Sequence, residues 1–293
     1  MKKKSLWTAY LELSKPRILL LVLVTATIGY YLGVQGLVAP FLYLNLLAGV
    51  GLTCAGSSAL NHYLERDYDA KMERTQNRPI PAGVLLPSHA LTFGIFLVLS
   101  GITILYTQVN LLTAFLCLLA AFLYIVVYTP MKRVSWVNTT LGAIPGAIPP
   151  LAGWAAAKGA LTFEAFILFL ILFIWQHPHF YAIGWMFKED YQRAGFKMLP
   201  CFDVDGQRTV SHIQGFTSAL IFASVVPTIA GMSGYFYFIA VLSTSIPLLL
   251  FTNSFVHSRS NTDARNLLKA TVLYIPALLI LIVLDSTFKF HPL

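Results

Sequence analysis

Long apolar runs recur along this chain, and each is about as long as a helix needs to cross a membrane. About 20 apolar residues span ~30 Å of hydrocarbon, and a helix satisfies its own backbone hydrogen bonds there. The sequence therefore predicts an all-α polytopic membrane protein with about nine transmembrane helices. The nine runs lie near residues 17–37, 40–60, 89–107, 110–128, 138–157, 163–182, 214–232, 234–253 and 270–287.

The composition leaves little room for another kind of domain. Hydrophobic residues make up 57% of the chain and charged residues 11%, whereas soluble domains contain about 25% charged residues. We therefore expect a single membrane-embedded domain over residues 1–293. The three cysteines, Cys54, Cys117 and Cys201, have no close spacing, which argues against a disulfide framework or a zinc site.

The net charge of +8 is distributed very unevenly. If the N-terminus is cytoplasmic, 18 of the 20 lysines and arginines fall in cytoplasmic segments, and only Lys158 and Lys289 lie elsewhere. This is the positive-inside bias of membrane proteins, so the charge predicts topology and argues against nucleic-acid binding. The first apolar run has no small-residue cleavage site, and no transit segment precedes it. These features favour a multi-pass protein of the bacterial inner membrane.

The acidic residues gather in two cytoplasmic loops, one after the second run and one after the sixth. Their positions suggest a duplicated four-helix unit, residues 17–128 and 138–253, followed by a ninth helix at 270–287. Eight of the 12 carboxylates belong to these loops: Glu65, Asp67, Asp69 and Glu73, then Glu189, Asp190, Asp203 and Asp205.

The first of these loops has a helical spacing of oxygen-bearing side chains. If the second span continues as a helix beyond the membrane, Asn61, Glu65 and Asp69 share one face at i, i+4 and i+8. Such a stripe suits Mg²⁺, which takes a few carboxylate oxygens together with water or phosphate. Arg74 and Arg78 are also four apart and suit a diphosphate. The alternative is a solvated loop held by local ion pairs.

At these residues the chain resembles a known family. The stripe Asn61…Glu65…Asp69 is similar to the NxxxDxxxD motif of the UbiA superfamily of intramembrane prenyltransferases. The stretch 61–79 as a whole resembles the heme-farnesylating branch of that superfamily. Two further stretches agree, 128–150, which begins Tyr-Thr-Pro-Met-Lys-Arg, and 175–200, which begins Trp-Gln-His-Pro-His-Phe. The resemblance covers about residues 10 to 285.

The sequence departs from the superfamily pattern in two places. Glu65 stands where the first motif has its middle aspartate, so this oxygen ligand is one methylene longer. The second DxxxD motif is not intact, because Ala194 stands four residues after Asp190. We therefore expect a second acidic cluster of reduced strength, in which Lys188 shares the role of one aspartate.

The resemblance implies a function and a set of site residues. It implies that the farnesyl group of farnesyl diphosphate is transferred to a vinyl group of heme B, with addition of water, giving heme O and diphosphate. The helices would surround a central cavity open to the cytoplasmic face. The cofactor would be Mg²⁺. The metal ligands would be Asn61, Glu65, Asp69 and Asp190, with Asp67 as a further catalytic carboxylate, and the diphosphate would contact Arg74, Arg78, Tyr128, Lys132 and Lys188.

Two histidines lie near the cytoplasmic end of the sixth run. His177 and His179 are at membrane depth, where an ionisable residue is by default a functional hypothesis, and imidazole is an axial ligand of heme iron. We therefore predict heme binding by this pair; the alternative is that each histidine only bonds a neighbouring helix. In the fifth run, Pro145, Pro149 and Pro150 alternate with glycines, which predicts a kinked helix or a close packing face.

Other functions fit less of the sequence. The same superfamily also prenylates other acceptors, such as quinone precursors. A transporter would carry acidic residues near the bilayer midplane, whereas here they crowd one face. A purely structural subunit explains neither Asn61 nor the acidic loops. The partners implied are the lipid bilayer and heme-handling or terminal oxidase assembly proteins.

Overall fold

The computed structural model describes residues 5–34 and 38–288, and this part of the chain is helical without a strand. Eight of its helices are long and apolar enough to cross a membrane. The remaining predicted span, the fifth, is α7, a helix of 21 residues whose prolines, glycines and alanines make it less apolar. Lys2, Lys3, Lys4, Lys289 and the end of the first predicted span, 35–37, lie outside the described residues.

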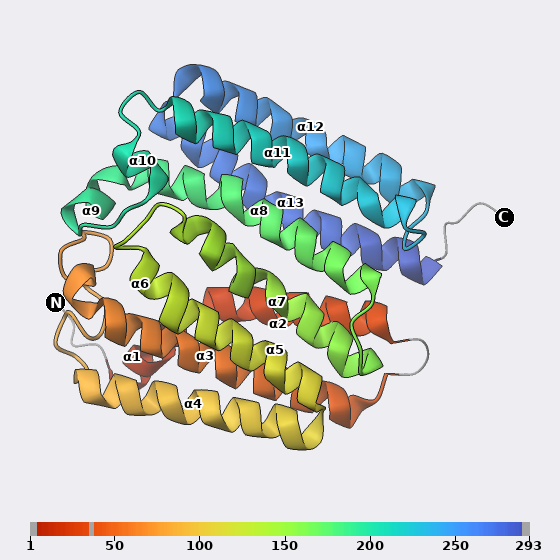
Figure 1. Cartoon of the computed structure of the whole chain (residues 1–293), viewed down its shortest axis with the longest axis horizontal. Coiled ribbons are helices and arrows are strands. Elements are labelled where there is room, and N and C mark those ends of the chain that lie inside the picture. The colour runs from red at the N-terminus through yellow and green to blue at the C-terminus, as the bar shows by residue number, and fades with distance from the viewer. Residues whose placement is uncertain (1–4, 35–37, 289–293) are drawn as a thin grey trace. The chain divides into compact units, whose positions relative to one another are not determined.

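Figure 1 shows the order of the helices. Their bounds are α1 Leu6–Leu13, α2 Pro16–Gly33, α3 Pro40–Asp69, α4 Pro87–Gln108, α5 Leu111–Phe122, the π-helical turn η1 Leu123–Tyr128, α6 Thr129–Met131, α7 Asn138–Lys158, α8 Phe163–Met186, α9 Lys188–Arg193, α10 Leu199–Phe202, α11 Gln207–Ile229, α12 Tyr235–Ser258 and α13 Asn261–Phe288.

The first of two compact units comprises Met1–Leu161 and Glu189–Lys197. In this unit α3 packs against α4, and α7 packs against α2 and α5. The contact between α2 and α7 depends on glycine, because a Cβ on Gly153 would overlap the carbonyl oxygen of Ala26, and one on Gly29 would overlap that of Pro150. Small residues let helices approach this closely. Of the two expectations for the fifth run, these contacts favour the packing face.

The second unit comprises Thr162–Lys188 and Met198–Leu293. In it α8 packs against α11 and α13, and α12 packs against α11 and α13. The fully buried Asp285 of α13 accepts hydrogen bonds from the backbone N–H groups of Gly234 and Tyr237 at the start of α12. These groups have no partner within their own helix, so this carboxylate within a span has a structural role.

Candidate functional site

The predicted oxygen-bearing stripe lies on α3. This helix runs without a break from Pro40 to Asp69, so it does continue beyond the second apolar run as expected. Asn61, Glu65 and Asp69 are 0%, 5% and 0% exposed, and they share the buried face of the last two turns. The helical spacing seen in the sequence is therefore real, and a solvated loop does not describe these residues.

Each member of the stripe has a basic partner. The Lys132 ammonium donates to Glu65 Oε1 at 2.7 Å, and one Arg78 nitrogen donates to both carboxylate oxygens of Asp69 at 2.8 and 2.7 Å. Lys15 Nζ donates to Asn61 Oδ1 at 2.7 Å. These cations relieve the repulsion between the two carboxylates. When all groups are ionised, three positive charges face two negative ones, so the cluster carries one excess positive charge.

The amide of Asn61 is held in one orientation. Its Nδ2 donates to Thr129 Oγ1 at 3.0 Å, and the Thr129 hydroxyl in turn donates to the carbonyl of Tyr124 at 2.8 Å. Because the hydroxyl proton of Thr129 is already used, Thr129 Oγ1 can only accept from Asn61. The amide oxygen of Asn61 therefore points to Lys15, where it is available as an oxygen ligand.

The turn that carries Thr129 is irregular. Leu123–Tyr128 is a π-helical turn, a feature often found at functional sites, and Pro130, which has no N–H to donate, follows it. Lys132 Nζ lies 4.6 Å from the centroid of the Tyr128 ring. The ring also lies against Gly142 of α7, where a Cβ would come within 2.5 Å of Tyr128 Cε2. Tyr128 and Lys132 are thus brought to the stripe together, and their contact with diphosphate stays a prediction.

Lys15 is a site residue that the sequence reasoning missed. Its backbone has φ of 48°, in the left-handed region that is unusual for a residue other than glycine. It precedes Pro16 at the start of α2, and its ammonium also donates to the Tyr124 hydroxyl at 3.1 Å. The only signal in the sequence is a lysine directly before a helix-starting proline, and this signal indicates topology alone.

The two site lysines differ in their pKa values. Burial and the nearby Arg78 guanidinium lower the pKa of Lys15 to about 7. Burial also lowers the pKa of Lys132, but the Glu65 carboxylate together with Tyr128 and Tyr124 outweighs burial and raises it above the usual lysine value. Lys132 is therefore a firmly charged partner of the stripe, whereas burial makes the charge on Lys15 costly.

Asp190 belongs to the first unit and contacts the loop that follows α3. Its carboxylate accepts from the backbone N–H groups of Glu73 and Arg74 at 3.2 and 3.4 Å and pairs with Arg193 at 2.7 Å. Arg74 donates to the Tyr191 hydroxyl at 3.0 Å. These bonds join the remnant of the second motif to the loop after the first. A metal-binding role for Asp190 stays a prediction.

Two predicted residues have no described contact with the stripe. Asp67 is 74% exposed and pairs with Arg66 at 3.6 Å, because two helical steps from Glu65 turn a side chain to the other side of α3. Lys188 belongs to the second unit, where its ammonium donates to the carbonyl of Asp203 at 3.4 Å.

The two predicted heme ligands lie on α8 in the second unit. His177 is fully buried, and its ring stacks on Phe216 at 3.8 Å between centroids. His179 is only partly buried, and its Nδ1 lies 3.0 Å from Thr271 Oγ1. The Thr271 hydroxyl donates to the carbonyl of Leu268 at 2.7 Å, so it accepts from His179. Nδ1 of His179 is then protonated, and Nε2 carries the lone pair.

The donor set of the stripe fits a hard divalent cation. It consists of one amide oxygen and two carboxylates, and Mg²⁺ completes such a shell with water and substrate phosphate. In the described ranges no group of three His, Cys, Asp or Glu side chains could hold a metal by itself. Beside Asn61, both ring nitrogens of the buried His62 lack a hydrogen-bond partner among the described residues.

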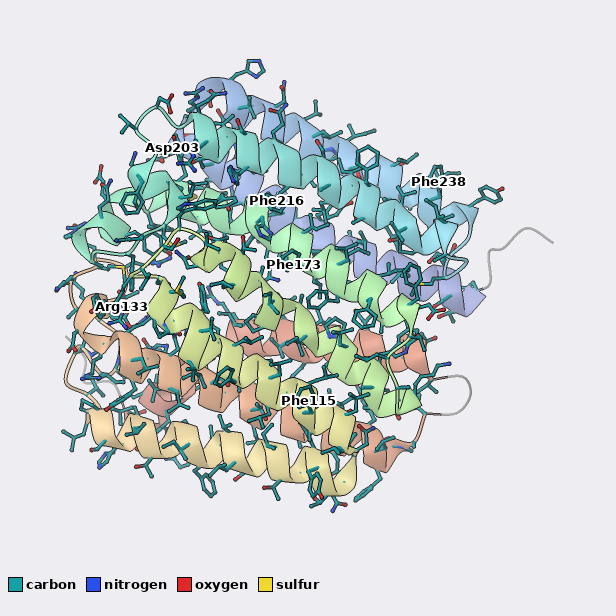
Figure 2. All side chains as sticks on the ribbon, in the orientation of Figure 1. Phe115, Arg133, Phe173, Asp203, Phe216 and Phe238 are labelled. Carbon is teal, nitrogen blue, oxygen red and sulfur yellow. The ribbon has the colours of Figure 1, made fainter. Side chains whose placement is uncertain are left out.

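Together, these helices and this buried cluster define a polytopic membrane protein with a cationic, oxygen-lined site suited to a metal–diphosphate. Figure 2 shows the helices with their side chains. The long helices carry apolar side chains over most of their length. The UbiA prenyltransferase family profile matches residues 22–275. The chain belongs to this family.

Curated relatives and solved structures agree with this assignment. The chain is 43% identical to the protoheme IX farnesyltransferase of Solibacter usitatus over 285 residues, covering 94% of this chain and 98% of that one. It is 41% identical to that of Salinibacter ruber over 281 residues, covering 96% and 99%. The fold matches a digeranylgeranylglyceryl phosphate synthase (TM-score 0.80, 17% identity, 98% and 99% covered). It also matches an Archaeoglobus fulgidus UbiA homologue bound to GPP and Mg²⁺, with a TM-score of 0.66 and 15% identity, covering 94% of this chain and 99% of that one.

Proposed function

We propose that this protein transfers the farnesyl group of farnesyl diphosphate to a vinyl group of heme B and adds water, giving heme O and diphosphate. The observation that carries the proposal is the buried cluster on α3, with three basic side chains against two carboxylates. The excess positive charge of such a cluster attracts an anion such as a diphosphate. Relatives named protoheme IX farnesyltransferase over nearly the whole length support the choice of substrates.

The basic residues bind and orient the diphosphate. Arg78 and Lys132 are already fixed by Asp69 and Glu65, so little side-chain freedom is lost when phosphate oxygens reach them. Negative charge grows on the diphosphate as its bond to the farnesyl carbon breaks. Preorganised cations in a water-poor site stabilise that growing charge more than they stabilise the ground state.

The stripe would hold the metal through Asn61, Glu65 and Asp69. When bound, Mg²⁺ neutralises phosphate charge and makes diphosphate a better leaving group. The chain's own part is to present these oxygens in a fixed geometry: Thr129 orients the Asn61 amide, and α3 sets the spacing of the carboxylates. The allylic cation is then attacked by the vinyl carbon, and water adds to the cation formed beside the pyrrole ring and loses a proton.

For heme binding, His179 is the better supported of the two histidines. Thr271 accepts from Nδ1 of His179, which leaves Nε2 with the lone pair that a heme iron requires. His177 is stacked face to face with Phe216, so its ring would have to be uncovered first. We further propose that the protein lies in the bacterial inner membrane with a cytoplasmic N-terminus.

The experiment is a reconstituted reaction. Protein purified in detergent is incubated with heme B, farnesyl diphosphate and Mg²⁺, and the products are examined by mass spectrometry. We expect heme O, and we expect excess EDTA to abolish its formation. A parallel incubation with an aromatic quinone precursor in place of heme tests the other acceptor class. Prenylation of the quinone precursor and not of heme would contradict the proposed substrate, and full turnover in EDTA would contradict the metal.

A further inference from the structure

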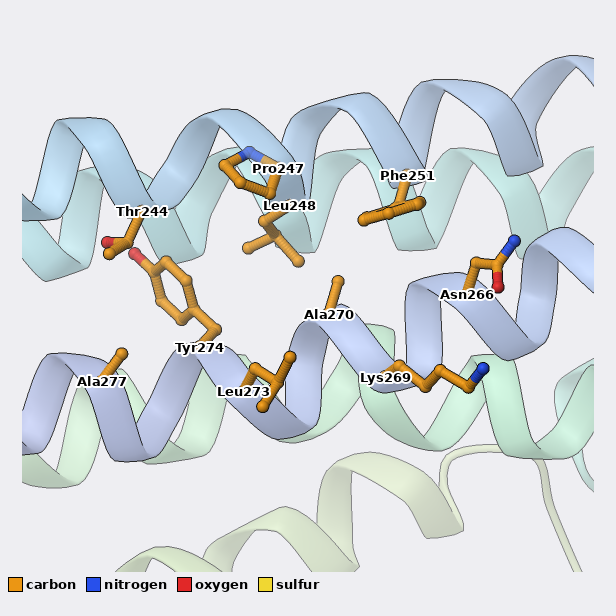
Figure 3. A pocket seen from close by; sticks show the side chains of 10 residues that line it. All are labelled: Thr244, Pro247, Leu248, Phe251, Asn266, Lys269, Ala270, Leu273, Tyr274 and Ala277. Atoms are coloured by element: carbon orange, nitrogen blue, oxygen red, sulfur yellow. The ribbon is translucent and has the colours of Figure 1, made fainter.

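A groove lies between α12 and α13 in the second unit, and none of its lining residues is among those discussed above as part of the reaction. Its volume is about 370 Å³, and Figure 3 shows its lining. Ala270 and Ala277 are small and leave space along α13, whereas Leu273 and Phe251 are 71% and 39% exposed at the rim. The groove is therefore accessible from the outside of this unit.

The hydroxyl groups in the groove already donate hydrogen bonds within the chain. The Tyr274 hydroxyl donates to Ser224 Oγ at 2.9 Å, and the Thr244 hydroxyl donates to the carbonyl of Ala240 at 2.9 Å. Only the rings and methyl groups of these residues are left to face a ligand. The surface between them is formed by Pro247, Leu248 and other apolar side chains. Along most of its length the groove thus offers apolar contacts only.

The length of the groove matches one leaflet of a membrane. Asn266 and Ala277 mark its two ends on α13 and are eleven residues apart. At 1.5 Å per residue this is about 16 Å, close to half of the ~30 Å hydrocarbon thickness. An extended acyl chain of a phospholipid has this reach.

One end of the groove is cationic. Figure 3 shows Asn266 and Lys269 together at that end, opposite Thr244 and Ala277. Lys269 forms no ion pair or hydrogen bond with any residue that the structure describes. The acidic residue nearest in sequence, Asp263, accepts hydrogen bonds from the hydroxyl groups of Ser258 and Ser260. Lys269 is exposed and directly precedes the apolar run 270–287, so its ammonium is expected at the membrane surface, where basic side chains attract anionic headgroups.

A second positive charge lies one helical turn away. Arg265 is exposed and precedes Lys269 by four residues, so both point to the same face of α13. Two like charges at this spacing repel each other, and an anionic headgroup placed near them relieves the repulsion. A zwitterionic headgroup, which carries its own positive charge, relieves it less.

We propose that this groove binds an anionic phospholipid, with an acyl chain along α12 and α13 and the phosphate on Lys269. The proposal does not depend on the reaction that the protein catalyses. It commits to a membrane lipid, because both helices are long and apolar enough to span a bilayer. An apolar groove on such helices leaves its walls without contacts unless a lipid chain fills it.

Native mass spectrometry of the detergent-purified protein tests the proposal. The protein is titrated with palmitoyl-oleoyl phosphatidylglycerol or with the matching phosphatidylcholine. We expect one phosphatidylglycerol to be retained more tightly than phosphatidylcholine. Lys269→Gln should weaken its retention about fivefold, as should Arg265→Gln, since each basic residue near a membrane surface contributes roughly that much. Ala270→Phe, which fills the groove, should reduce retention of both lipids.

The control is Lys158→Gln, an exposed lysine at the end of α7, which should leave retention unchanged. Equal retention of the two lipids by the wild-type protein would overturn the assignment of an anionic ligand. Undiminished binding in Ala270→Phe would place the lipid elsewhere. Stoichiometric displacement of the lipid by farnesyl diphosphate would make the groove a substrate site, also against the proposal. A thermal melt of each variant shows that it is folded.

Discussion

Three oxygen-bearing side chains on one helix face each contact a different basic residue from elsewhere in the chain. The partners of Asn61, Glu65 and Asp69 come from before α2, after α6 and after α3. Burial makes each pair strong and also makes each charge costly if its partner is removed. The same cations that hold the stripe are therefore those that a phosphate oxygen would meet.

The first prediction concerns Asp69, the most buried carboxylate of the stripe. Asp69→Ala removes a proposed metal ligand and leaves Arg78 without its partner. We expect heme O formation to fall about 10²–10³-fold, the usual effect of losing one oriented electrostatic contact, while heme binding measured by absorption stays unchanged.

The control is Glu189→Ala, which removes an exposed carboxylate of the same charge and should change the rate little. Normal turnover by Asp69→Ala would remove this residue from the metal–diphosphate site.

The second prediction concerns Lys15. Lys15→Met keeps the length of the side chain but removes the ammonium that contacts Asn61 and Tyr124. We expect the KM for farnesyl diphosphate to rise about 10- to 100-fold, because a hydrogen bond to a charged group contributes about 1.5–3 kcal/mol. Steady-state kinetics measures this rise. Lys158→Met should behave as wild type, and an unchanged KM in Lys15→Met would limit Lys15 to a structural role.

The third prediction concerns the heme half. His179→Ala should weaken heme binding or change the heme absorption spectrum and leave farnesyl diphosphate affinity as it is. Thr271→Val keeps the shape of its side chain but removes the acceptor of His179 Nδ1, so it should give a smaller change of the same kind. Normal heme spectra in His177→Ala and His179→Ala would refute the predicted heme contacts without touching the argument for the diphosphate.

At this scale the sequence predicted the residues that follow a helical period and missed the one that does not. Asn61, Glu65 and Asp69 are related by the pitch of α3, and Arg78 lies close behind. Lys15 contacts Asn61 although the two residues are 46 positions apart in the chain, and a local sequence pattern cannot predict a contact over that separation. The same helical pitch explains why Asp67 is exposed, because it follows Glu65 by two residues and so faces the other side of α3.

Among the elements, the long helices agree with the apolar runs, and several of them extend beyond these runs. α11 begins at Gln207 and α13 at Asn261, seven and nine positions before the predicted spans. Hydropathy reports the part of a helix that lies in hydrocarbon, whereas hydrogen bonding continues the helix into the headgroup region. The π-helical turn Leu123–Tyr128 could not be predicted, because it leaves no mark on the hydropathy of the sequence.

The fourth prediction belongs to the contact between α2 and α7. Gly153→Ala adds a methyl group where it would overlap the backbone of Ala26, so the helices must move apart. Overpacking of this kind costs about 1–3 kcal/mol, and we expect a lower melting temperature in detergent. Gly215→Ala in α11 is the matched control, because its added methyl group meets nothing within 4 Å and alanine favours helix. An unchanged melting temperature in Gly153→Ala would contradict the close contact.

Over the whole molecule, charge says more about orientation than about fold. The number of helices follows from apolar length, and the family follows from the motifs on α3, on α6 and α7, and on α8. The four-helix repeat proposed from the acidic loops stays a prediction. In the structure, α7 packs with α2 and α5 in the first unit, although the sequence had grouped it with the later helices. Packing partners depend on which faces are small, and a count of spans does not contain that information.

The last prediction tests the orientation of the chain. Lys158 and Gln76 are both exposed and lie on opposite sides of the membrane if 18 of the 20 basic residues are cytoplasmic. In a background without Cys54, Cys117 and Cys201, a membrane-impermeant thiol reagent added to intact spheroplasts should label Lys158→Cys and spare Gln76→Cys. Permeabilised cells, as the control, should show both labelled. Because the loop after α3 carries Arg78, the reverse pattern would put the cationic cluster on the outer face and exclude diphosphate delivered from the cytoplasm.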